Sequence, residues 1–408
     1  MRSSHKFWIP YSKFLKNIAM KKLVLIITSV ILFTSIKAQE KQSVFSNMTL
    51  NGYVKYMNTV MFNDVDSIWL VDNLVHNRLN YNWYISDKLT FSAGMRNRLI
   101  YGDLLKFIPG YADSFEEDNG FLNFLTNNIS DGNSYVLTTT FDRTYFEYNN
   151  NSWVVTIGRQ RINWGQSFAW NPNDIFNSYS FFDFDYEERA GSDAVRIQYY
   201  PSFTSVADVA VKIDKDNNIT AAGLYRFNKW GYDIQFLAGV IDSSDYVIGT
   251  GWSGSIKDFG FNGEISYFHP QENFSDSTGI AIVNAGLSYM FGNSLSITFE
   301  GNYNGYFDKL NLNSFNDLYF MPLSVKTTTY SKFSWFGQIS YPIHPLLTGT
   351  LAAMYFPSLG DGYFLMPSLA YSVSNNFECA LYGQRFEGKF GGQYDKMTML
   401  FLRFRYSF

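Results

Sequence analysis

The residues with the clearest chemical potential are arginines at alternate positions and a run of acidic residues that follows them. The arginines, with one asparagine on the same parity, would share one face of their strands: Arg78, Arg96, Arg98, Arg159, Arg161 and Asn163. The acidic residues fall within residues 164–190 and are Asp174, Asp183, Asp185, Glu187 and Glu188. Guanidinium groups facing carboxylates across a narrow passage create a field that selects ions and orients polar solutes. The same pairs would also hold a loop against a wall, and the sequence leaves the two roles open.

Catalytic and metal-binding chemistry is poorly supported. Nucleophilic catalysis needs a base beside a serine or cysteine, and none of three histidines has a partner at a recognisable spacing: His76, His269 and His344. Cys379 is the single cysteine, so thiolates cannot build a metal site. The acids at 183–188 lack the glycine and distal glutamate of a calcium loop. We expect no enzyme, no cofactor and no metal; a hydrolase using His269 and a surface calcium site are the minor alternatives.

The elements that must position the charged residues are amphipathic β-strands. In the last segment, Leu400, Leu402, Phe404, Tyr406 and Phe408 share one parity, while Arg403 and Arg405 share the other. Such a strand presents one apolar face to lipid and one polar face to a lumen. We expect eighteen strands near 50–61, 70–85, 89–101, 135–148, 153–163, 191–200, 204–213, 219–228, 231–241, 246–256, 259–268, 280–290, 294–305, 332–341, 346–356, 363–373, 377–387 and 397–408.

The connections between these segments alternate in length. Every second connection is a turn of a few residues, such as residues 86–88 and 257–258. The long connections, 102–134, 164–190, 269–279 and 306–331, all belong to the other set. This alternation is typical of an antiparallel up-and-down transmembrane barrel. Sixteen strands remain the alternative if one pair of short strands is misassigned.

The N-terminal region has the features of a secretory signal peptide. Lys21 and Lys22 precede the short apolar run 23–33, and Ala38 offers a cleavage site before Gln39. We expect residues 1–38 to be removed and the true start to be Met20. Residues 39–49 would be a short periplasmic segment, and residues 50–408 the barrel. After the signal no apolar run is long enough for a transmembrane helix.

Composition and charge agree with a barrel in the outer membrane. Aromatic residues make up 19% of the chain and charged residues only 17%, below the usual quarter of a soluble domain. Removing residues 1–38 removes seven Lys and Arg but no acid, which leaves a formal net charge of about −11. This charge argues against nucleic acid as a partner.

Two stretches resemble known outer-membrane proteins. The chain ends on Phe408, after Phe404 and Tyr406, which resembles the assembly signal of bacterial barrels. Residues 158–165 (GRQRINWG), followed by Asn-Pro-Asn-Asp at 171–174, resemble porin-like barrels related to alginate-export channels, in a form similar to that of Bacteroidota. The resemblance covers about 20 residues and implies a passive channel or export pore, with Arg159 and Arg161 at the matching positions. It does not imply alginate, for which a strongly basic lumen is expected.

These observations predict a Gram-negative porin-like channel for passive diffusion or export of small polar solutes. Residues 164–190 are the third connection on the side of the long loops and would narrow the lumen, where Phe181–Tyr186 either pack against the wall or stack on sugar rings. The expected partners are outer-membrane lipid, lipopolysaccharide and the barrel assembly machinery, with the oligomeric state open. The alternative is an occluded barrel that acts as a surface receptor or as a component of a secretion or polysaccharide-export complex.

Overall fold

A computed structural model describes residues 46–108, 110–179, 181–310, 312–313 and 323–408. The expected signal peptide, residues 1–38, lies outside these ranges. The strands are β1 Met48–Phe62, β2 Leu70–Ser86, β3 Leu89–Gly102, β4 Thr126–Gly132, β5 Tyr135–Asn150, β6 Trp153–Gln160, β7 Ser192–Ser202, β8 Ser205–Ile213, β9 Ile219–Lys229, β10 Tyr232–Ile241, β11 Asp245–Ile256, β12 Phe259–Pro270, β13 Ile280–Met290, β14 Ser296–Asn304, β15 Phe333–His344, β16 Leu347–Phe356, β17 Gly362–Ser374, β18 Phe377–Phe390 and β19 Gln393–Ser407.

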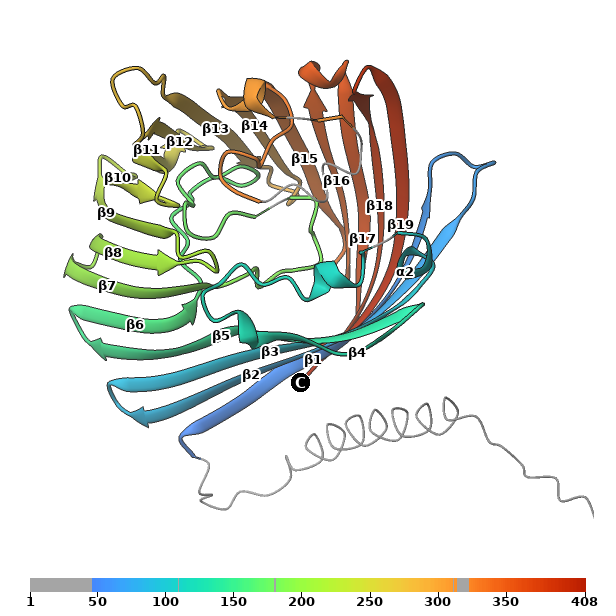
Figure 1. Ribbon diagram of the computed structural model, residues 1–408, viewed down its shortest axis with the longest axis horizontal. Helices are drawn as coiled ribbons and strands as arrows, with labels where there is room; N and C mark the ends of the chain where they lie inside the picture. The colour runs from blue at the N-terminus through green and yellow to red at the C-terminus, as the bar shows by residue number, and fades with distance from the viewer. Residues whose placement is uncertain (1–45, 109, 180, 311, 314–322) are drawn as a thin grey trace, which may run out of the picture. The chain divides into compact units, whose positions relative to one another are not determined.

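The strands form one closed antiparallel barrel (Figure 1). Each wall strand pairs with its neighbours along the chain, and β1 pairs with both β2 and β19, so no edge is left open. Eighteen of the strands in the described ranges form the wall, as the sequence predicts. The additional strand, β4, belongs to the long connection 103–134 and pairs with the upper part of β5, beyond the end of β6.

Short helical segments occur only in the connections of the described chain. They are α2 Leu104–Phe107, η1 Asp113–Phe115, η2 Asn123–Leu125, η3 Phe307–Lys309 and η4 Pro357–Leu359. No helix among the described residues is long and apolar enough to cross a membrane.

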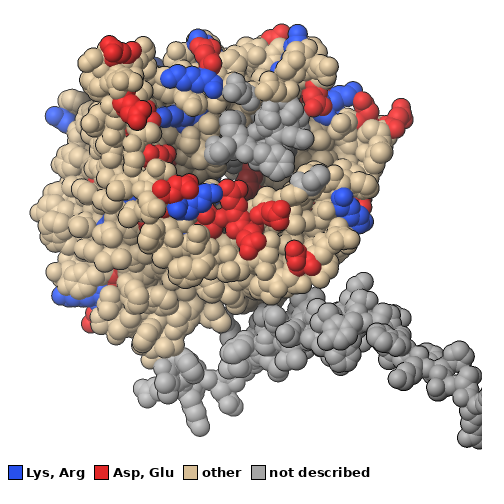
Figure 2. Space-filling view, in the orientation of Figure 1, with Lys and Arg blue, Asp and Glu red and all other residues tan. Residues whose placement is uncertain are grey.

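The wall has two chemically different faces because side chains alternate along each strand. Leu400, Phe299 and Leu351 are among the exposed apolar side chains of the outer face. Polar side chains such as Lys55, His76 and Glu300 point inward and are buried. Figure 2 shows the consequence from outside, where charged side chains gather around the hollow centre and the rim. The flank has few charges in the same view, as a lipid-facing surface requires.

Exposed aromatic side chains mark the rim where the short turns lie. They stand within a few residues of these turns and are Trp83, Tyr84, Tyr148, Trp153, Tyr199, Tyr200, Phe203, Trp230, Phe259, Phe291, Tyr341 and Tyr371. An aromatic girdle of this kind is typical of barrels at the membrane–water interface. The predicted alternation of turn lengths is confirmed, since all the turns at this rim are short.

Candidate functional site: a loop inserted into the barrel

The connection between β6 and β7, residues 161–191, runs through the barrel interior (Figure 1). We call it the inserted loop. Its first half contacts β10 to β14, and its second half contacts β1 to β3, β5 and β15 to β19. Residues 164–190 were expected to enter the lumen. In the structure this loop lies inside the barrel and reaches nearly all sides of the wall.

Two buried glutamates of the wall hold the first half of the loop. Glu264 on β12 and Glu300 on β14 are fully buried and face inward. Glu264 accepts the backbone N–H groups of Gln166, Ser167 and Asn173. Glu300 accepts those of Phe168, Ala169 and Trp170, at 2.5, 2.9 and 3.4 Å. Since buried N–H groups need acceptors, these two carboxylates fix the path of the loop.

The motif at 158–165 lies at the base of the loop, and the first of its two arginines, Arg159, is not exposed to the lumen. Gly158 has a φ of +121°, and a Cβ there would lie 2.3 Å from the carbonyl oxygen of Thr144, so only glycine fits. Arg159 follows and is 3% exposed. Its guanidinium pairs with Asp193 on β7 at 2.8 Å and with Asp118 at 2.6 Å. Arg159 therefore ties the loop base to the connection 103–134.

The rest of the motif is also used for packing and hydrogen bonding. Trp164 is 1% exposed, and its indole N–H donates to Asp208 on β8 at 3.0 Å. Asn163 is exposed, whereas Asp174 is buried and accepts from the backbone N–H of Trp164 at 3.3 Å. Arg161 is half-buried and has no ion-pair partner among the described residues. Burial raises the pKa of Asp174 from its ordinary 3.8 to about 7, because the charged form loses hydration.

Aromatic side chains of the second half pack against an apolar sector of the inner wall. Phe182 stacks edge-on against Phe364 of β17 with ring centroids 4.7 Å apart, and Phe184 lies 5.0 Å from Phe401 of β19. Phe181 contacts Phe336 of β15 at 5.0 Å. The inward face of β15 to β19 is thus apolar at this level, which the expectation of a polar lumen did not include. Of the two roles left open for Phe181–Tyr186, packing against the wall is the one observed.

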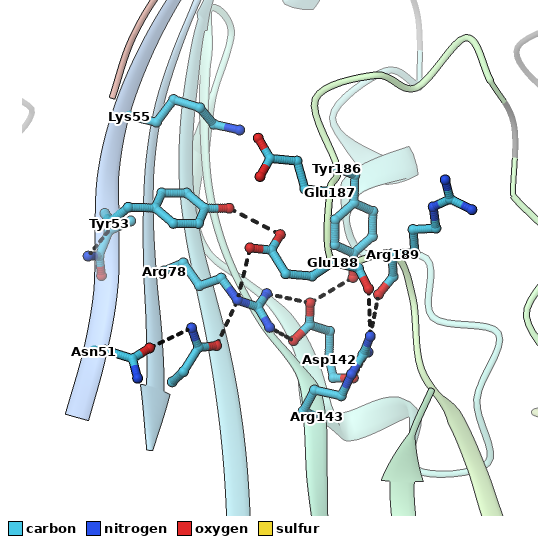
Figure 3. A network of polar contacts seen from close by, with 12 residues as sticks. Asn51, Tyr53, Lys55, Arg78, Asp142, Arg143, Tyr186, Glu187, Glu188 and Arg189 are labelled. Atoms are coloured by element: carbon cyan, nitrogen blue, oxygen red, sulfur yellow. Dashed lines mark hydrogen bonds and ion pairs between the residues drawn. The ribbon is translucent and has the colours of Figure 1, made fainter. Parts of the chain in front are cut away.

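Three acids of the second half, Asp185, Glu187 and Glu188, pair with cations of the wall, and Figure 3 shows the pair of Glu188 with Arg78. Asp185 lies 2.7 Å from Lys55 of β1, which is only 2% exposed. Arg78 of β2 pairs with Asp142 of β5 at 2.7 Å and with Glu188 at 3.5 Å. Arg78 therefore faces inward but is covered by the loop.

Three further side chains complete this network. Tyr53 donates to Glu188 at 3.2 Å, and Tyr186 donates to Asp142 at 2.7 Å. Arg143 donates to the backbone carbonyl of Glu188 at 2.6 Å. The network therefore holds both the side chains and the backbone of the loop.

The last strand supplies a second pair of cations to the loop. Arg405 pairs with Glu187 at 2.7 Å, and Arg403 lies 3.6 Å from Asp185 and 3.5 Å from Glu187. Lys55, which sequence reasoning did not single out, belongs to the same set. Its inward parity within the predicted strand 50–61 was the signal that could have found it, as was that of Arg403 in the last strand.

Arg96, Arg98 and Asp183 behave differently from the paired residues. Arg96 and Arg98 lie on the inward face of β3, and no ion pair joins either to an acid among the described residues. The Arg96 guanidinium lies 3.5 Å from the ring centroid of Tyr186. Asp183 is exposed to the interior space, and the charges of Arg96, Lys55 and Arg98 act on it. These three charges are the candidates for contact with a solute.

No group of three or more His, Cys, Asp or Glu side chains that could hold a metal lies in the described ranges. His76 is buried on β2, His269 contacts the carbonyl of Pro270 and the ring of Phe274, and His344 lies beside a short turn. None of them lies beside a serine or an acid in these contacts.

A closed antiparallel barrel of eighteen wall strands, in which the third connection on the side of the long loops enters the interior, defines a fold class, that of the porin-type barrels. No protein-family model and no curated protein sequence matches the chain. Among solved structures it is similar to Pseudomonas aeruginosa OccK11 (OpdR), with a TM-score of 0.56 and 8% identity over 88% of this chain and 96% of that chain.

Two further solved structures show the same likeness. Acinetobacter baumannii OccAB4 has a TM-score of 0.54 and 10% identity, over 90% of this chain and 100% of that chain. Pseudomonas aeruginosa OccK8 (OprE) has 0.53 and 8%, over 89% and 98%. At these identities the likeness establishes the porin-type fold.

Proposed function

We propose that this protein is a porin-like channel of the Gram-negative outer membrane, through which small polar solutes pass by passive diffusion or export. The observation that carries the proposal is the closed eighteen-stranded wall with a charged loop held inside it. Barrels of this strand number are wide enough for an aqueous path. The inserted loop then sets the width and the charge of that path.

The same proposal implies which lipids and proteins the chain contacts. The apolar flank would contact outer-membrane lipid and lipopolysaccharide, and the C-terminal Phe404, Tyr406 and Phe408 would be read by the barrel assembly machinery. The protein would need no cofactor and would catalyse no reaction. The likeness of residues 158–177 to alginate-export-type barrels supports a relation to those barrels and an origin in Bacteroidota. It does not support alginate as the solute.

Single-channel recording in a planar bilayer tests the proposal. The purified protein should give steady current steps in KCl, and a KCl gradient should give a reversal potential different from zero. Shortening the inserted loop between residues 165 and 188 should raise the conductance several-fold, because the loop fills much of the interior. Insertion of folded protein without any current would refute the channel proposal.

One observation favours a second candidate, an occluded barrel that serves as a receptor or as a component of an export complex. Two clusters of buried apolar side chains join the loop to the wall on both sides, around Trp164 and around Phe336. Packing of this density would close much of the cross-section. Recovery of a partner at fixed stoichiometry after mild solubilisation, together with silent bilayers, would favour this second function.

A further inference from the structure

A group of buried polar atoms without a partner lies at one place on the inner wall. His76 on β2, Arg98 and Arg96 on β3 and Thr140 on β5 are near neighbours, since the strand register pairs His76 with Arg98 and Arg96 with Thr140. Both ring nitrogens of His76, both arginine Nε atoms and the Thr140 hydroxyl are buried, and none has a hydrogen-bond partner among the described residues. A buried polar atom left without a partner is costly, so such a concentration indicates a binding position.

The guanidinium groups at this place are held but not neutralised. Arg96 is 8% exposed, and its guanidinium is fixed by the ring of Tyr186. The Arg98 guanidinium lies 5.4 Å from the ring of Phe115. Aromatic contact orients a guanidinium without occupying its N–H donors. The terminal nitrogens of both residues are not fully covered and make no hydrogen bond to the described residues.

The surrounding acids are already engaged, with one exception. Asp142 accepts from Arg78 and Tyr186, Glu188 accepts from Tyr53 and forms an ion pair with Arg78, and Asp185 pairs with Lys55. Asp183 is the exception, since it is exposed and makes no hydrogen bond to these arginines while its charge acts on both. The two adjacent strands therefore offer two guanidinium groups that form no ion pair with an acid among the described residues.

We infer that Arg96 and Arg98, with the Thr140 hydroxyl and His76 beside them, form a binding site for a small oxyanion of the carboxylate or phosphate type. The inference rests on the proposed function and gives it a class of solute, because an anion in the lumen would pause at this site. Its oxygens would accept from the planar guanidinium forks, which match such groups in geometry. The net negative charge of the whole chain would predict a preference for cations. Anion binding at this site would show that the local charge outweighs the net charge.

Binding of inorganic phosphate to the detergent-solubilised protein, measured by equilibrium dialysis at constant ionic strength, tests the site. We expect saturable binding that Arg96→Gln and Arg98→Gln each weaken by about tenfold, as loss of one charge-assisted contact requires. Arg385→Gln is the matched control, because Arg385 lies on β18 in a partly exposed pair with Glu387. It should change the affinity by less than about twofold.

Two more variants separate a binding site from a structural role. Arg96→Lys keeps the charge but removes the planar fork, so it should weaken phosphate binding, whereas the control Arg385→Gln should leave chloride conductance near that of the unmodified protein. Asp183→Asn removes the competing carboxylate and should tighten phosphate binding severalfold. A general loss of folding cannot produce this gain.

The outcomes separate this inference from the proposed function. Unmodified protein that conducts but binds no phosphate, or arginine variants that bind it unchanged, would overturn the oxyanion site alone. Saturable binding that depends on Arg96 and Arg98 in a protein that never conducts would support the site and overturn the channel.

Discussion

At the scale of single residues, Asp174 is the acid of the inserted loop least exposed to water. Its carboxylate is 1% exposed, and one of its oxygens has no partner among the described residues. Burial outweighs the charges of Arg161, Arg189 and Lys212, which act in the opposite direction on its pKa. The protonated form of Asp174 is therefore favoured more strongly than the protonated form of an exposed aspartate.

We predict that the base of the inserted loop is less stable at pH 8 than at pH 5. The pKa of Asp174 is raised to about 7 in the folded loop from an ordinary 3.8, so the folded state holds the proton over this window and the open state does not. Stability then falls as pH rises through the window. Hydrogen exchange of residues 162–177, corrected for the intrinsic rate, measures the effect.

The control for this prediction is Asp174→Asn, which cannot titrate. In that variant the free energy of local opening should no longer change between pH 5 and pH 8 through this site. A pH dependence of the same size in the asparagine variant would contradict the assignment to Asp174.

The arginines show how much can be predicted from residue type and strand position when the contacts are not known. Their inward parity placed Arg78, Arg96 and Arg98 correctly on the inner wall, because alternation along a strand is a local property. Parity could not show that Arg78 is covered by Asp142 and Glu188. The partners lie 64 and 110 positions away in the chain, and only the closed barrel brings them together.

At the scale of elements, the inserted loop is held in two different ways. Its first half depends on backbone N–H groups that donate to Glu264 and Glu300, whereas its second half depends on ion pairs and aromatic contacts. Backbone donors are present in any sequence, so nothing in residues 166–173 revealed their acceptors. The signal that existed was a glutamate at the inward parity of strand 294–305, which the sequence pattern treats like any other polar residue.

We predict that Glu300→Gln loosens the first half of the loop. The amide keeps one acceptor oxygen but turns an N–H₂ group toward the backbone donors of Phe168, Ala169 and Trp170. The free energy of opening at these residues should fall by about 2 kcal/mol, the range for a lost hydrogen bond to a charged group. Hydrogen exchange of residues 166–170 reports it.

Glu147→Gln on β5 is the control, because no hydrogen bond joins the Glu147 carboxylate to the described residues of the loop. It should leave exchange in residues 166–170 unchanged. Equal protection in the Glu300 variant and the unmodified protein would show that the aromatic contacts alone hold this half.

At the scale of the whole molecule, the wall was predictable in nearly every strand because it rests on local periodicity and turn residues. All eighteen predicted segments correspond to wall strands, with shifts of a few residues at their ends. The short strand β4 was missed, since it pairs with β5 inside a long connection and lacks a clear alternation of its own. The apolar inner sector of β15 to β19 was missed because apolar side chains occupy both faces of these strands, so the sequence does not distinguish the inner face from the outer one.

The orientation of the wall in a membrane can be tested with two adjacent residues. Leu351 lies at the middle of β16 on the outer face, and Thr350 lies beside it on the inner face, where its hydroxyl contacts Ser340. We predict that Leu351→Arg lowers the free energy of unfolding in lipid vesicles by about 2–4 kcal/mol, as for a charge placed in the bilayer. Urea titration of the refolded protein measures it.

Thr350→Arg places the same charge at the same depth on the opposite face. It should cost far less stability, since its side chain lies beside the Ser340 hydroxyl on the inner face and not in lipid. Equal losses for the two variants would mean that both faces are in the same medium, which a barrel in a bilayer excludes.

The two glutamates that hold the loop also impose an order of assembly. The loop donors precede their acceptors by 91 to 132 positions in the chain, and contacts of such long range form late. Until β12 and β14 have joined the wall, the backbone N–H groups of residues 166–173 lack these two acceptors. Protease resistance within residues 166–173 should therefore appear after the strands themselves have formed. Its appearance would report that the wall has closed.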